Sequence, residues 1–345
     1  MNLDPISPRA QGVTMAHGSG GRAMQQLIEQ MFLQAFDNPW LREQEDGARL
    51  ALSDLCAQGD RLAFTTDSYV IDPIFFPGGN IGKLAVCGTA NDLAVCGATP
   101  AWLSCGFILE EGFSLDALRE IVSAMAQTAR DAGIAIVTGD TKVVQRGAAD
   151  KIFINTSGIG AIPSAVRWAA TAMQPGDKVI VSGTLGDHGA TILNLRERLG
   201  MDLDVESDCA VLAPLIAPLH AIAGVRALRD ATRGGVNAIL HEFARASGYG
   251  IVIDENALPV RPAVRGICEL LGLEPINFAN EGKVVLVTSP QAEATTLKAL
   301  RSHPLGRDAA TVGEVTPEPQ VALRGLLGVT RQLMLPHAEP LPRIC

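Results

Sequence analysis

Hydrophobic and polar positions in the first half of the chain follow two repeats, one typical of strands and the other typical of helices. Strand-like runs occur at residues 61–71, 101–109, 134–137 and 151–162. Helix-like spacing occurs at residues 22–35, 81–97 and 114–132, and Ser114 is the expected N-cap of the third helix. The pattern predicts helices packed on a sheet.

The second half repeats this alternation after a turn signal at Pro175-Gly176-Asp177. Strands are predicted at residues 179–181, 225–231, 250–253 and 284–288. Helices are predicted after the glycine-rich turn 183–189 and at residues 237–246 and 291–301. Alternation in both halves predicts layers of α/β or α+β type with ligand space between them.

The length of 345 residues also favours two domains. We predict an N-terminal segment at residues 1–44, a first domain at 45–165, a second domain at 166–330 and a tail at 331–345. Pro336, Pro340 and Pro342 exclude helix and central strand from the tail. They favour an extended chain, which ends at Cys345.

Composition narrows the class of protein. Hydrophobic residues make up 47% of the chain and charged residues 19%, which is typical of a globular core and argues against disorder. The net charge of −9 argues against nucleic acids and anionic membranes as partners. No apolar run reaches the ~20 residues of a membrane span, and residues 1–5 show no secretory signal. None of the seven cysteines forms a C-x-x-C pair, so we expect reduced thiols and a cytoplasmic protein.

Five carboxylates lie at the ends of apolar runs or on glycine-rich turns: Asp67, Asp92, Asp140, Asp230 and Glu281. Any one of them is more often a helix cap or a turn residue. Together they favour a metal–phosphate site, because Mg²⁺ takes carboxylate and phosphate oxygens. The alternating acidic residues Asp202, Asp204, Glu206 and Asp208, by contrast, indicate a solvated face.

A glycine-rich loop at residues 17–21, His17-Gly18-Ser19-Gly20-Gly21, precedes the first predicted helix. Its backbone N–H groups are suited to phosphate, but a flexible linker is an equally good interpretation. No Lys-Ser or Lys-Thr pair follows, so it is not a Walker loop. The loose G-x-G-x-x-A match through Gly18, Gly20 and Ala23 lacks a clear preceding strand and is a weak sign of dinucleotide binding.

Cys345 is the last residue, at the end of a proline-spaced arm. Chain ends are often frayed, and that is the simpler interpretation. The alternative is an arm that carries a thiol-bound group into a distant pocket. At roughly 3.3 Å per extended residue, ten residues reach ~30 Å, about the width of a small domain.

Several of these motifs together resemble one family. They are His17-Gly18-Ser19-Gly20-Gly21, Thr66-Asp67-Ser68, Pro77-Gly78-Gly79, Asn91-Asp92-Leu93-Ala94, Gly139-Asp140-Thr141-Lys142-Val143, Asp230-Ala231-Thr232-Arg233-Gly234-Gly235 and the ending Pro342-Arg343-Ile344-Cys345. Over nearly its whole length the chain resembles the HypE family of hydrogenase maturation factors, the carbamoyl dehydratases. That family lies within the ATP-binding superfamily of aminoimidazole ribonucleotide synthetase and selenophosphate synthetase.

The resemblance implies an α+β fold of two domains with ATP between them. The N-terminal domain would bind ATP and form a homodimer through its mixed sheet. The C-terminal domain would be α/β-like, with a flexible tail after it. The terminal Cys345 would receive a carbamoyl group from the carbamoyltransferase HypF, and ATP would phosphorylate the carbamoyl oxygen. Loss of phosphate would leave a thiocyanate, whose cyanide passes to iron on a HypC–HypD scaffold for [NiFe]-hydrogenase.

The resemblance also implies roles for single residues. Cys345 would carry the carbamoyl group, and either Glu281 or Lys142 would be the base that takes protons from its nitrogen. Mg²⁺ would be held by Asp67, Asp92, Asp140 and Asp230, which also lie at the nucleotide. The other ATP contacts would be His17, Gly18, Ser19, Gly20, Gly21, Asn91, Thr141 and Arg233. We expect the tail to point inward for ATP chemistry and outward for loading and delivery.

Three other functions are compatible with the residues. One is a synthetase of the same superfamily that acts on a free small molecule and does not need Cys345. Another is a scaffold without catalysis that binds maturation partners through its tail, in which Asp92→Asn would be harmless. The third is a Rossmann dehydrogenase, which absent binding of NAD(H) would exclude.

Overall fold

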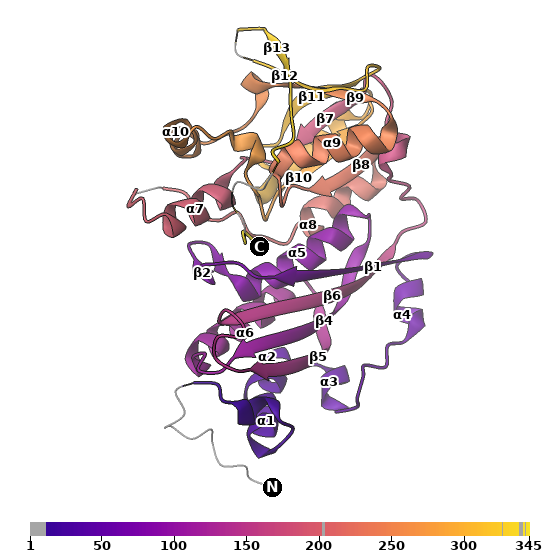
Figure 1. Cartoon of the computed structure of the whole chain (residues 1–345). Helices are drawn as coiled ribbons and strands as arrows, with labels where there is room; N and C mark the ends of the chain where they lie inside the picture. Colours follow the sequence, from indigo (N-terminus) through magenta and orange to yellow (C-terminus); the bar gives the residue numbers. More distant parts are fainter. Residues whose placement is uncertain (1–11, 202–203, 326, 338–340, 342) are drawn as a thin grey trace.

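The computed structural model describes residues 12–201, 204–325, 327–337, 341 and 343–345. It contains two domains, each built on its own sheet, and the end of the chain lies between them (Figure 1). The expected two-domain organisation is confirmed. Within the described residues, no helix has the length and apolarity to cross a membrane.

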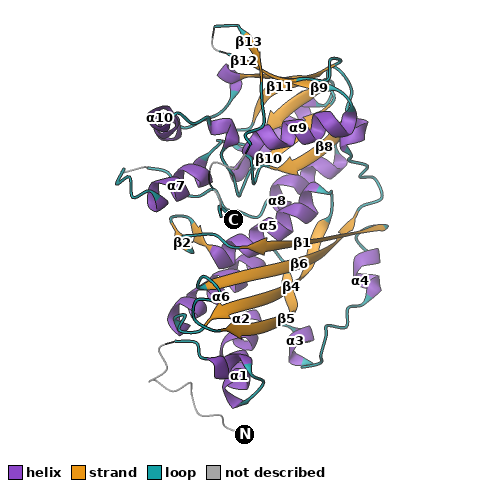
Figure 2. Ribbon diagram, in the orientation of Figure 1, coloured by secondary structure: helices purple, strands orange, loops and turns teal. Residues whose placement is uncertain are grey.

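The first domain is a four-stranded sheet in the order β1-β6-β4-β5. Its strands are β1 (Arg61–Tyr69), β4 (Thr99–Glu110), β5 (Ala135–Val144) and β6 (Ile152–Ile162), and only β4 and β5 pair in parallel. The long helices α5 (Ile81–Val95) and α6 (Leu115–Asp131) cover one face (Figure 2). A small hairpin, β2 (Phe75–Phe76) and β3 (Gly79–Asn80), precedes α5.

The N-terminal segment packs against β5, the edge strand of this sheet. It consists of η1 (Met15–Gly18), α1 (Arg22–Leu27), the π-helical turn η2 (Ile28–Leu33), α2 (Gln34–Phe36) and α3 (Pro39–Arg42). The short helix α4 (Leu52–Cys56) follows and packs against β6. Gly18 lies so close to β5 that a Cβ atom there would be 2.8 Å from the backbone nitrogen of Val143. The glycine-rich loop is therefore fixed at one end to β5.

The second domain is a seven-stranded sheet in the order β13-β12-β9-β11-β7-β10-β8. Its strands are β7 (Lys178–Val181), β8 (Val225–Asp230), β9 (Gly250–Asp254), β10 (Val284–Thr288), β11 (Ala310–Thr316), β12 (Val321–Arg324) and β13 (Thr330–Gln332). Every pair is antiparallel except β9–β12. Of the two layer types expected from the sequence, this domain is therefore α+β.

Helices cover both faces of the second sheet. The helix α9 (Gly235–Ser247) lies on one face, and α8 (Ala213–Ile216) and α11 (Glu293–Arg301) lie on the other. The helices α7 (Asp187–Arg196) and α10 (Pro262–Leu271) instead pack into the same hydrophobic cluster as the first domain. In β10, which lies between β7 and the edge strand β8, Val285 and Val287 pack on the α9 side, whereas Val284 and Leu286 pack on the α8 and α11 side. Burial on both faces explains why β10 is an uninterrupted apolar run rather than an alternating one.

Most predicted strands and helices are confirmed with shifts of a few residues, and Ser114 caps α6 by accepting a hydrogen bond from the Ala117 N–H. Two predictions were wrong in ways that affect the site. The strand predicted at 134–137 continues to Val144, so Asp140 lies inside β5 rather than on a turn. The strand predicted at 61–71 ends at Tyr69, because the tail occupies the backbone groups that follow.

The end of the tail is docked between the domains. The Val70 N–H donates to the main-chain carboxyl oxygen of Cys345 at 3.1 Å, and the Asp72 N–H donates to the Arg343 carbonyl at 3.4 Å. Ile344 and Cys345 are 1% and 9% exposed, so the simpler interpretation of a frayed end does not apply to them. Of the prolines expected to keep the tail extended, Pro336 lies in irregular chain, while Pro340 and Pro342 lie outside the described residues.

Candidate active site

A pocket of about 130 Å³ lies where the two domains meet the end of the chain. The first domain contributes Asp67 from β1 and Asp92 from α5. The second contributes Asp230 from the end of β8 and two loop residues, Arg233 and Glu281. Cys345 completes the lining, together with Thr66, Tyr69, Gly88 and Thr232. Three of the four aspartates named from the sequence thus meet the terminal cysteine.

Two loops of the second domain are tied together beneath this pocket. The Ala231 N–H donates to the Lys283 carbonyl at 2.9 Å, and the Asn280 N–H donates to the Ala231 carbonyl at 2.8 Å. The Asn280 side chain also accepts a hydrogen bond from the Gly186 N–H at 2.8 Å. These bonds fix Asp230 and Glu281 relative to each other.

The pKa values of two aspartates of the pocket, Asp92 and Asp230, are raised. Burial raises the pKa of Asp92, and the charge of Asp67 raises it further. A 2.8 Å hydrogen bond from the Thr65 hydroxyl to the Asp92 carboxylate partly lowers it. Burial, followed by the charge of Asp92, raises the pKa of Asp230 to about 7. Carboxylates held this close repel one another, so the cluster favours a cation or a proton between them.

Glu281 is the most isolated carboxyl group of the site. The residue is 2% exposed, and its Oε1 atom has no hydrogen-bond partner among the described residues. Burial raises its pKa well above the usual range, and neighbouring Cys209 and Asp208 raise it further. A carboxyl group with raised pKa is suited to accept a proton from a weak acid.

Arg233 is the cationic residue of the pocket lining. Its guanidinium lies 3.9 Å from the Asp67 carboxylate, and its side chain is 67% exposed. The charge of Cys345 raises the pKa of Arg233, against the effect of burial, and Asp67 raises it further. An exposed guanidinium at the mouth of an acidic pocket is suited to phosphate oxygens.

The structure does not bring Asp140, Thr141 or Lys142 to this pocket. They lie on β5, three strands away from β1, which at ~4.8 Å per strand is about 14 Å. In the β4–β5 register Ile108 pairs with Lys142, which puts Asp140 and Lys142 on the sheet face opposite α5. Within one chain, the sheet separates Asp140 from Asp67, so these two aspartates do not share one metal site.

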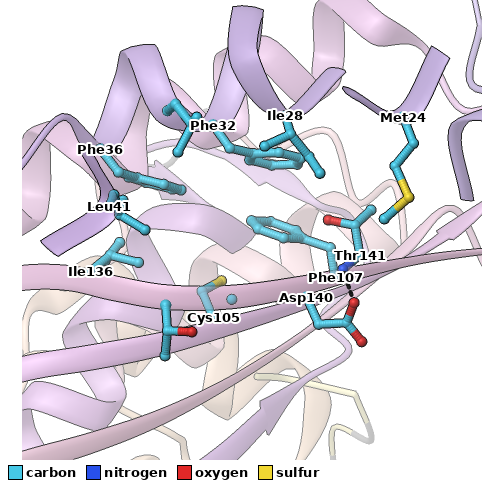
Figure 3. A pocket seen from close by; sticks show the side chains of 13 residues that line it. Met24, Ile28, Phe32, Phe36, Leu41, Cys105, Phe107, Ile136, Asp140 and Thr141 are labelled. Atoms are coloured by element: carbon cyan, nitrogen blue, oxygen red, sulfur yellow. Dashed lines mark hydrogen bonds between the residues drawn. The ribbon is translucent and has the colours of Figure 1, made fainter. Parts of the chain in front are cut away.

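Asp140 and Lys142 pair with each other instead, at 2.8 Å. The Lys142 ammonium lowers the pKa of Asp140. Beside them, Thr141 lines a separate, largely apolar pocket of about 140 Å³ between β5 and the N-terminal helices, with Phe32 and Phe107 stacked at 4.9 Å (Figure 3). Figure 3 shows the Asp140 carboxylate on the side of the strand away from the Phe32 ring.

The glycine-rich loop and Asn91 are also apart from the Cys345 pocket. His17 is buried near β5, where its Nδ1 accepts a hydrogen bond from the Thr14 N–H at 2.9 Å, and Gly20 and Gly21 are exposed. The amide of Asn91 donates to the Ala210 carbonyl and accepts from the Leu212 N–H, at 3.0 Å and 2.7 Å. Asn91 therefore fastens α5 to the second domain.

Two family models match the chain. The N-terminal domain of AIR synthase related proteins matches residues 44–162, and the C-terminal domain of the same proteins matches residues 174–325. Carbamoyl dehydratase HypE from Escherichia coli (strain K12) is 68% identical over 333 residues, which are 96% of this chain and 99% of that protein.

The chain belongs to the HypE family.

Solved HypE structures share the fold. The crystal structure of E. coli HypE superposes with a TM-score of 0.91 at 68% identity and covers 93% of this chain and all of that one. A HypE crystallised in complex with ATP also has a TM-score of 0.91, at 45% identity, covering 96% and 99%. In a solved HypE–HypF complex the matching chain has a TM-score of 0.79 at 44% identity, covering 90% and 99%. The family and fold expected from the motifs are confirmed.

Sequence reasoning missed several residues that shape this HypE-type pocket. Asp208 was assigned to a solvated face, which is wrong: its carboxylate is 3% exposed and pairs with the Lys283 ammonium at 3.0 Å. Burial raises the pKa of Asp208, but Lys283 and the Glu281 N–H outweigh it and the pKa is lowered. The alternation at residues 202–208 gave no sign of this ion pair. The usable signal was Lys283, a charged residue two positions after Glu281 and directly before the apolar run of β10. Asp204 and Glu206 are exposed as expected, and Asp202 lies outside the described residues.

Proposed function

We propose that this chain catalyses the ATP-dependent dehydration of a carbamoyl group carried on its own Cys345, giving a thiocyanate that supplies cyanide to [NiFe]-hydrogenase. One observation carries the proposal most directly: the terminal thiol lies inside a pocket with Glu281 and carboxylates from both domains. The names of its relatives, carbamoyl dehydratases at up to 68% identity over nearly the whole chain, agree with it.

The chemistry needs a better leaving group and a base. The oxygen of the carbamoyl thioester, S–C(=O)–NH₂, attacks the γ-phosphoryl group of ATP and releases ADP. The C–O bond then breaks, the oxygen leaves with the phosphoryl group as phosphate, and the C–N bond becomes a nitrile. The overall change is carbamoyl thioester plus ATP to thiocyanate, ADP, phosphate and one proton. Glu281 is the base that we assign, because its unpartnered Oε1 is buried beside Cys345 and is suited to take a proton from nitrogen.

The acidic residues fit Mg²⁺ bound together with phosphates. Among the described residues, no three His, Cys, Asp or Glu side chains gather closely enough to hold an ion by themselves. Mg²⁺ in nucleotide sites is typically held by one or two carboxylates plus phosphate oxygens, and Asp67, Asp92 and Asp230 offer such a set. Bound there, Mg²⁺ would neutralise charge on the transferring phosphoryl group. Arg233 would assist from the pocket mouth.

A pocket of about 130 Å³ is much smaller than the roughly 300–1,000 Å³ of ligand sites, so one chain encloses only part of a nucleotide. The outer face of the first sheet exposes Leu62, Phe64 and Ile108, by 56%, 65% and 44%. We assign this apolar face to the contact of a homodimer. Asp140 and Lys142 share the face, and we assign them to the nucleotide site of the partner copy, together with the glycine-rich loop and Thr141.

Loading and delivery require the tail to leave the pocket, because Cys345 is 9% exposed in the inward position. HypF is the carbamoyl donor that we assign, since a HypE–HypF complex has been solved for a chain 44% identical to this one. A HypC–HypD scaffold would accept the cyanide. The reaction would take place in the cytoplasm, where the thiol stays reduced.

The test compares the full-length chain with Cys345→Ala in an assay of ATP turnover that depends on the carbamoyl donor. Loss of that turnover in Cys345→Ala is expected, while nucleotide binding persists. Undiminished turnover would contradict the proposal and favour a synthetase that acts on a free small molecule. Asp92→Asn provides a second arm: unchanged function there would favour a scaffold without catalysis.

A further inference from the structure

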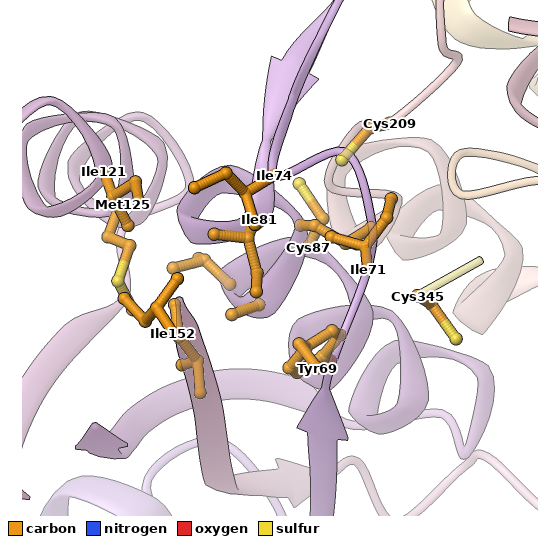
Figure 4. Packing of buried hydrophobic residues seen from close by; sticks show 14 of the residues in the cluster. Tyr69, Ile71, Ile74, Ile81, Cys87, Ile121, Met125, Ile152, Cys209 and Cys345 are labelled. Atoms are coloured by element: carbon orange, nitrogen blue, oxygen red, sulfur yellow. The ribbon is translucent and has the colours of Figure 1, made fainter. Parts of the chain in front are cut away.

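One hydrogen bond to the docked tail is completely buried. Nε2 of His188 lies 2.9 Å from the backbone carbonyl oxygen of Ile344, and the two residues are 0% and 1% exposed. The last three residues also accept hydrogen bonds from the backbone N–H groups of Val70 and Asp72 and from the partly exposed side chain of Arg196. The exposed side chain of Arg343 donates to the Val70 carbonyl and to the Asp150 carboxylate. Figure 4 shows Cys345 beside the segment that carries Tyr69 and Ile71.

The chemistry of the partners fixes the direction of this hydrogen bond. A carbonyl oxygen only accepts, so Nε2 of His188 carries the hydrogen and donates it to Ile344. In the neutral ring Nδ1 then accepts, and the Ser207 hydroxyl, 2.7 Å away, donates to it. Burial lowers the pKa of His188, which favours this neutral form, although the Ile344 carbonyl opposes the shift.

The chain of hydrogen bonds continues into the loop that positions Glu281. The Cys209 N–H donates to the Ser207 hydroxyl oxygen at 3.2 Å. The same hydroxyl therefore accepts from Cys209 and donates its hydrogen to Nδ1 of His188. One residue away, the Asp208 carboxylate accepts the Glu281 N–H at 2.9 Å. Residues 207–209 therefore connect the tail to the base that the proposed reaction uses.

Packing holds the His188 ring in place. The ring meets Phe76 edge-on, with centroids 5.5 Å apart at 85°, and it lies in the first turn of α7. A ring held between an aromatic face and a hydroxyl has one orientation available, so its donor points at one place along the tail.

We propose that His188, oriented by Ser207, is a positioning residue for the dehydration: it binds the Ile344 carbonyl and thereby sets the sulfur of Cys345 against Glu281. This inference rests on the proposed function for its catalytic consequence, but the docking of the tail can be measured without any reaction. The main-chain bond fixes the position of the tail, and the buried side chain of Ile344 adds selectivity for an apolar residue before the cysteine.

Two substitutions separate the donor from the bulk of the ring. Asn at position 188 keeps a polar group near Nδ1 for Ser207 but does not reach Ile344. Gln is longer and places an amide N–H near the position of Nε2. One net hydrogen bond corresponds to roughly a three- to tenfold change in the population of the docked tail. The population of the docked tail should fall by this factor in His188→Asn and return close to that of the wild type in His188→Gln.

The experiment measures alkylation of Cys345 by iodoacetamide in the full-length protein, resolved by peptide mass spectrometry, with the exposed Cys96 as internal reference. We expect roughly three- to tenfold faster alkylation of Cys345 in His188→Asn, with the rate of Cys96 unchanged. The single-turnover rate of the carbamoylated protein should fall by the same factor in His188→Asn, with the KM for ATP unchanged. His188→Gln should lie near the wild type in both assays.

His241→Asn is the matched control, because Nε2 of His241 makes the same kind of bond, 3.0 Å to the Leu333 carbonyl, outside the docked end. It should leave Cys345 alkylation unchanged. Ser207→Ala, which removes only the orienting hydroxyl, replaces His188→Asn if that variant does not fold. Wild-type alkylation in both His188→Asn and Ser207→Ala would overturn the positioning role. An absent ATP-dependent mass change in the wild type would contradict the proposed function alone, since alkylation does not depend on turnover.

Discussion

Lys283 and Asp208 form a buried ion pair next to Glu281: the Lys283 ammonium lies 3.0 Å from the Asp208 carboxylate, and the two side chains are 9% and 3% exposed. The same carboxylate accepts the Glu281 N–H. The pair therefore fixes the loop after α7 to the start of β10 and, through it, the position of the catalytic carboxyl group that we propose.

Lys283→Met should destabilise the fold strongly. It leaves the buried Asp208 carboxylate without its counter-ion, which costs roughly 3–5 kcal/mol in comparable cases. Urea unfolding followed by circular dichroism measures the loss. Lys178→Met is the control, because Lys178 pairs with Glu314 at 2.9 Å with both side chains partly exposed, and about 1 kcal/mol or less is expected there. Equal effects of the two substitutions would contradict the role of the buried pair.

Glu281→Gln should abolish most of the dehydration without unfolding the protein. The amide keeps the shape of the side chain but cannot accept the proton, and removing a general base typically costs roughly 10²–10⁴ in rate. The melting temperature should change little, because Gln has nearly the shape of Glu and Oε1 of Glu281 has no hydrogen-bond partner to lose among the described residues. The measurement is a single-turnover rate by intact mass, and a rate within a few-fold of wild type would exclude Glu281 as the base.

The stability of the nucleotide-free protein should fall as the pH rises from about 4 to about 7. Asp230 has a folded-state pKa of about 7, above its ordinary value of 3.8, so in this window the folded state binds the proton more tightly than the unfolded state. The slope is at most about 1.4 kcal/mol per pH unit for this group. Melting temperatures across the window should show a shallower slope in Asp230→Asn, and identical slopes would contradict the assignment.

Phe64→Asp should convert a dimer to a monomer. Phe64 is 65% exposed on the outer face of the first sheet, next to other apolar side chains, and a charge there opposes burial against a second copy. Light scattering after size exclusion gives the mass. Leu270→Asp, at a 67% exposed residue of α10 in the other domain, should leave the mass unchanged. A monomeric wild type would refute the dimer contact.

The local elements could be predicted because their signals are local. The apolar run of β10 and the Ser114 cap of α6 are readable in a few residues. The helix α10 and the strand β11 were missed, because α10 begins at Pro262 in a proline-containing stretch and β11 is a largely polar run with a glycine inside it. Pairing of β11 with β7 and β9 decides its conformation, and that pairing is not visible in its own residues.

The candidate site was predictable in its chemistry but not in its geometry. Asp230 and Glu281 could be named from their surroundings in the sequence, yet which side of the sheet Asp140 faces depends on the register of β5 against β4. The docking of Cys345 onto Val70 joins residues far apart in the chain, so no local pattern could show it. Asp208 looked solvated because its partner, Lys283, lies 75 residues further along the chain.

The most direct test of the account follows the mass of the intact protein after incubation with the carbamoyl donor system, before and after addition of ATP and Mg²⁺. The account predicts that the chain first gains one carbamoyl group on Cys345 and then, with ATP and Mg²⁺, loses the mass of one water from the same residue. A carbamoyl adduct that persists unchanged with ATP and Mg²⁺ present, or an adduct on a residue other than Cys345, would contradict it.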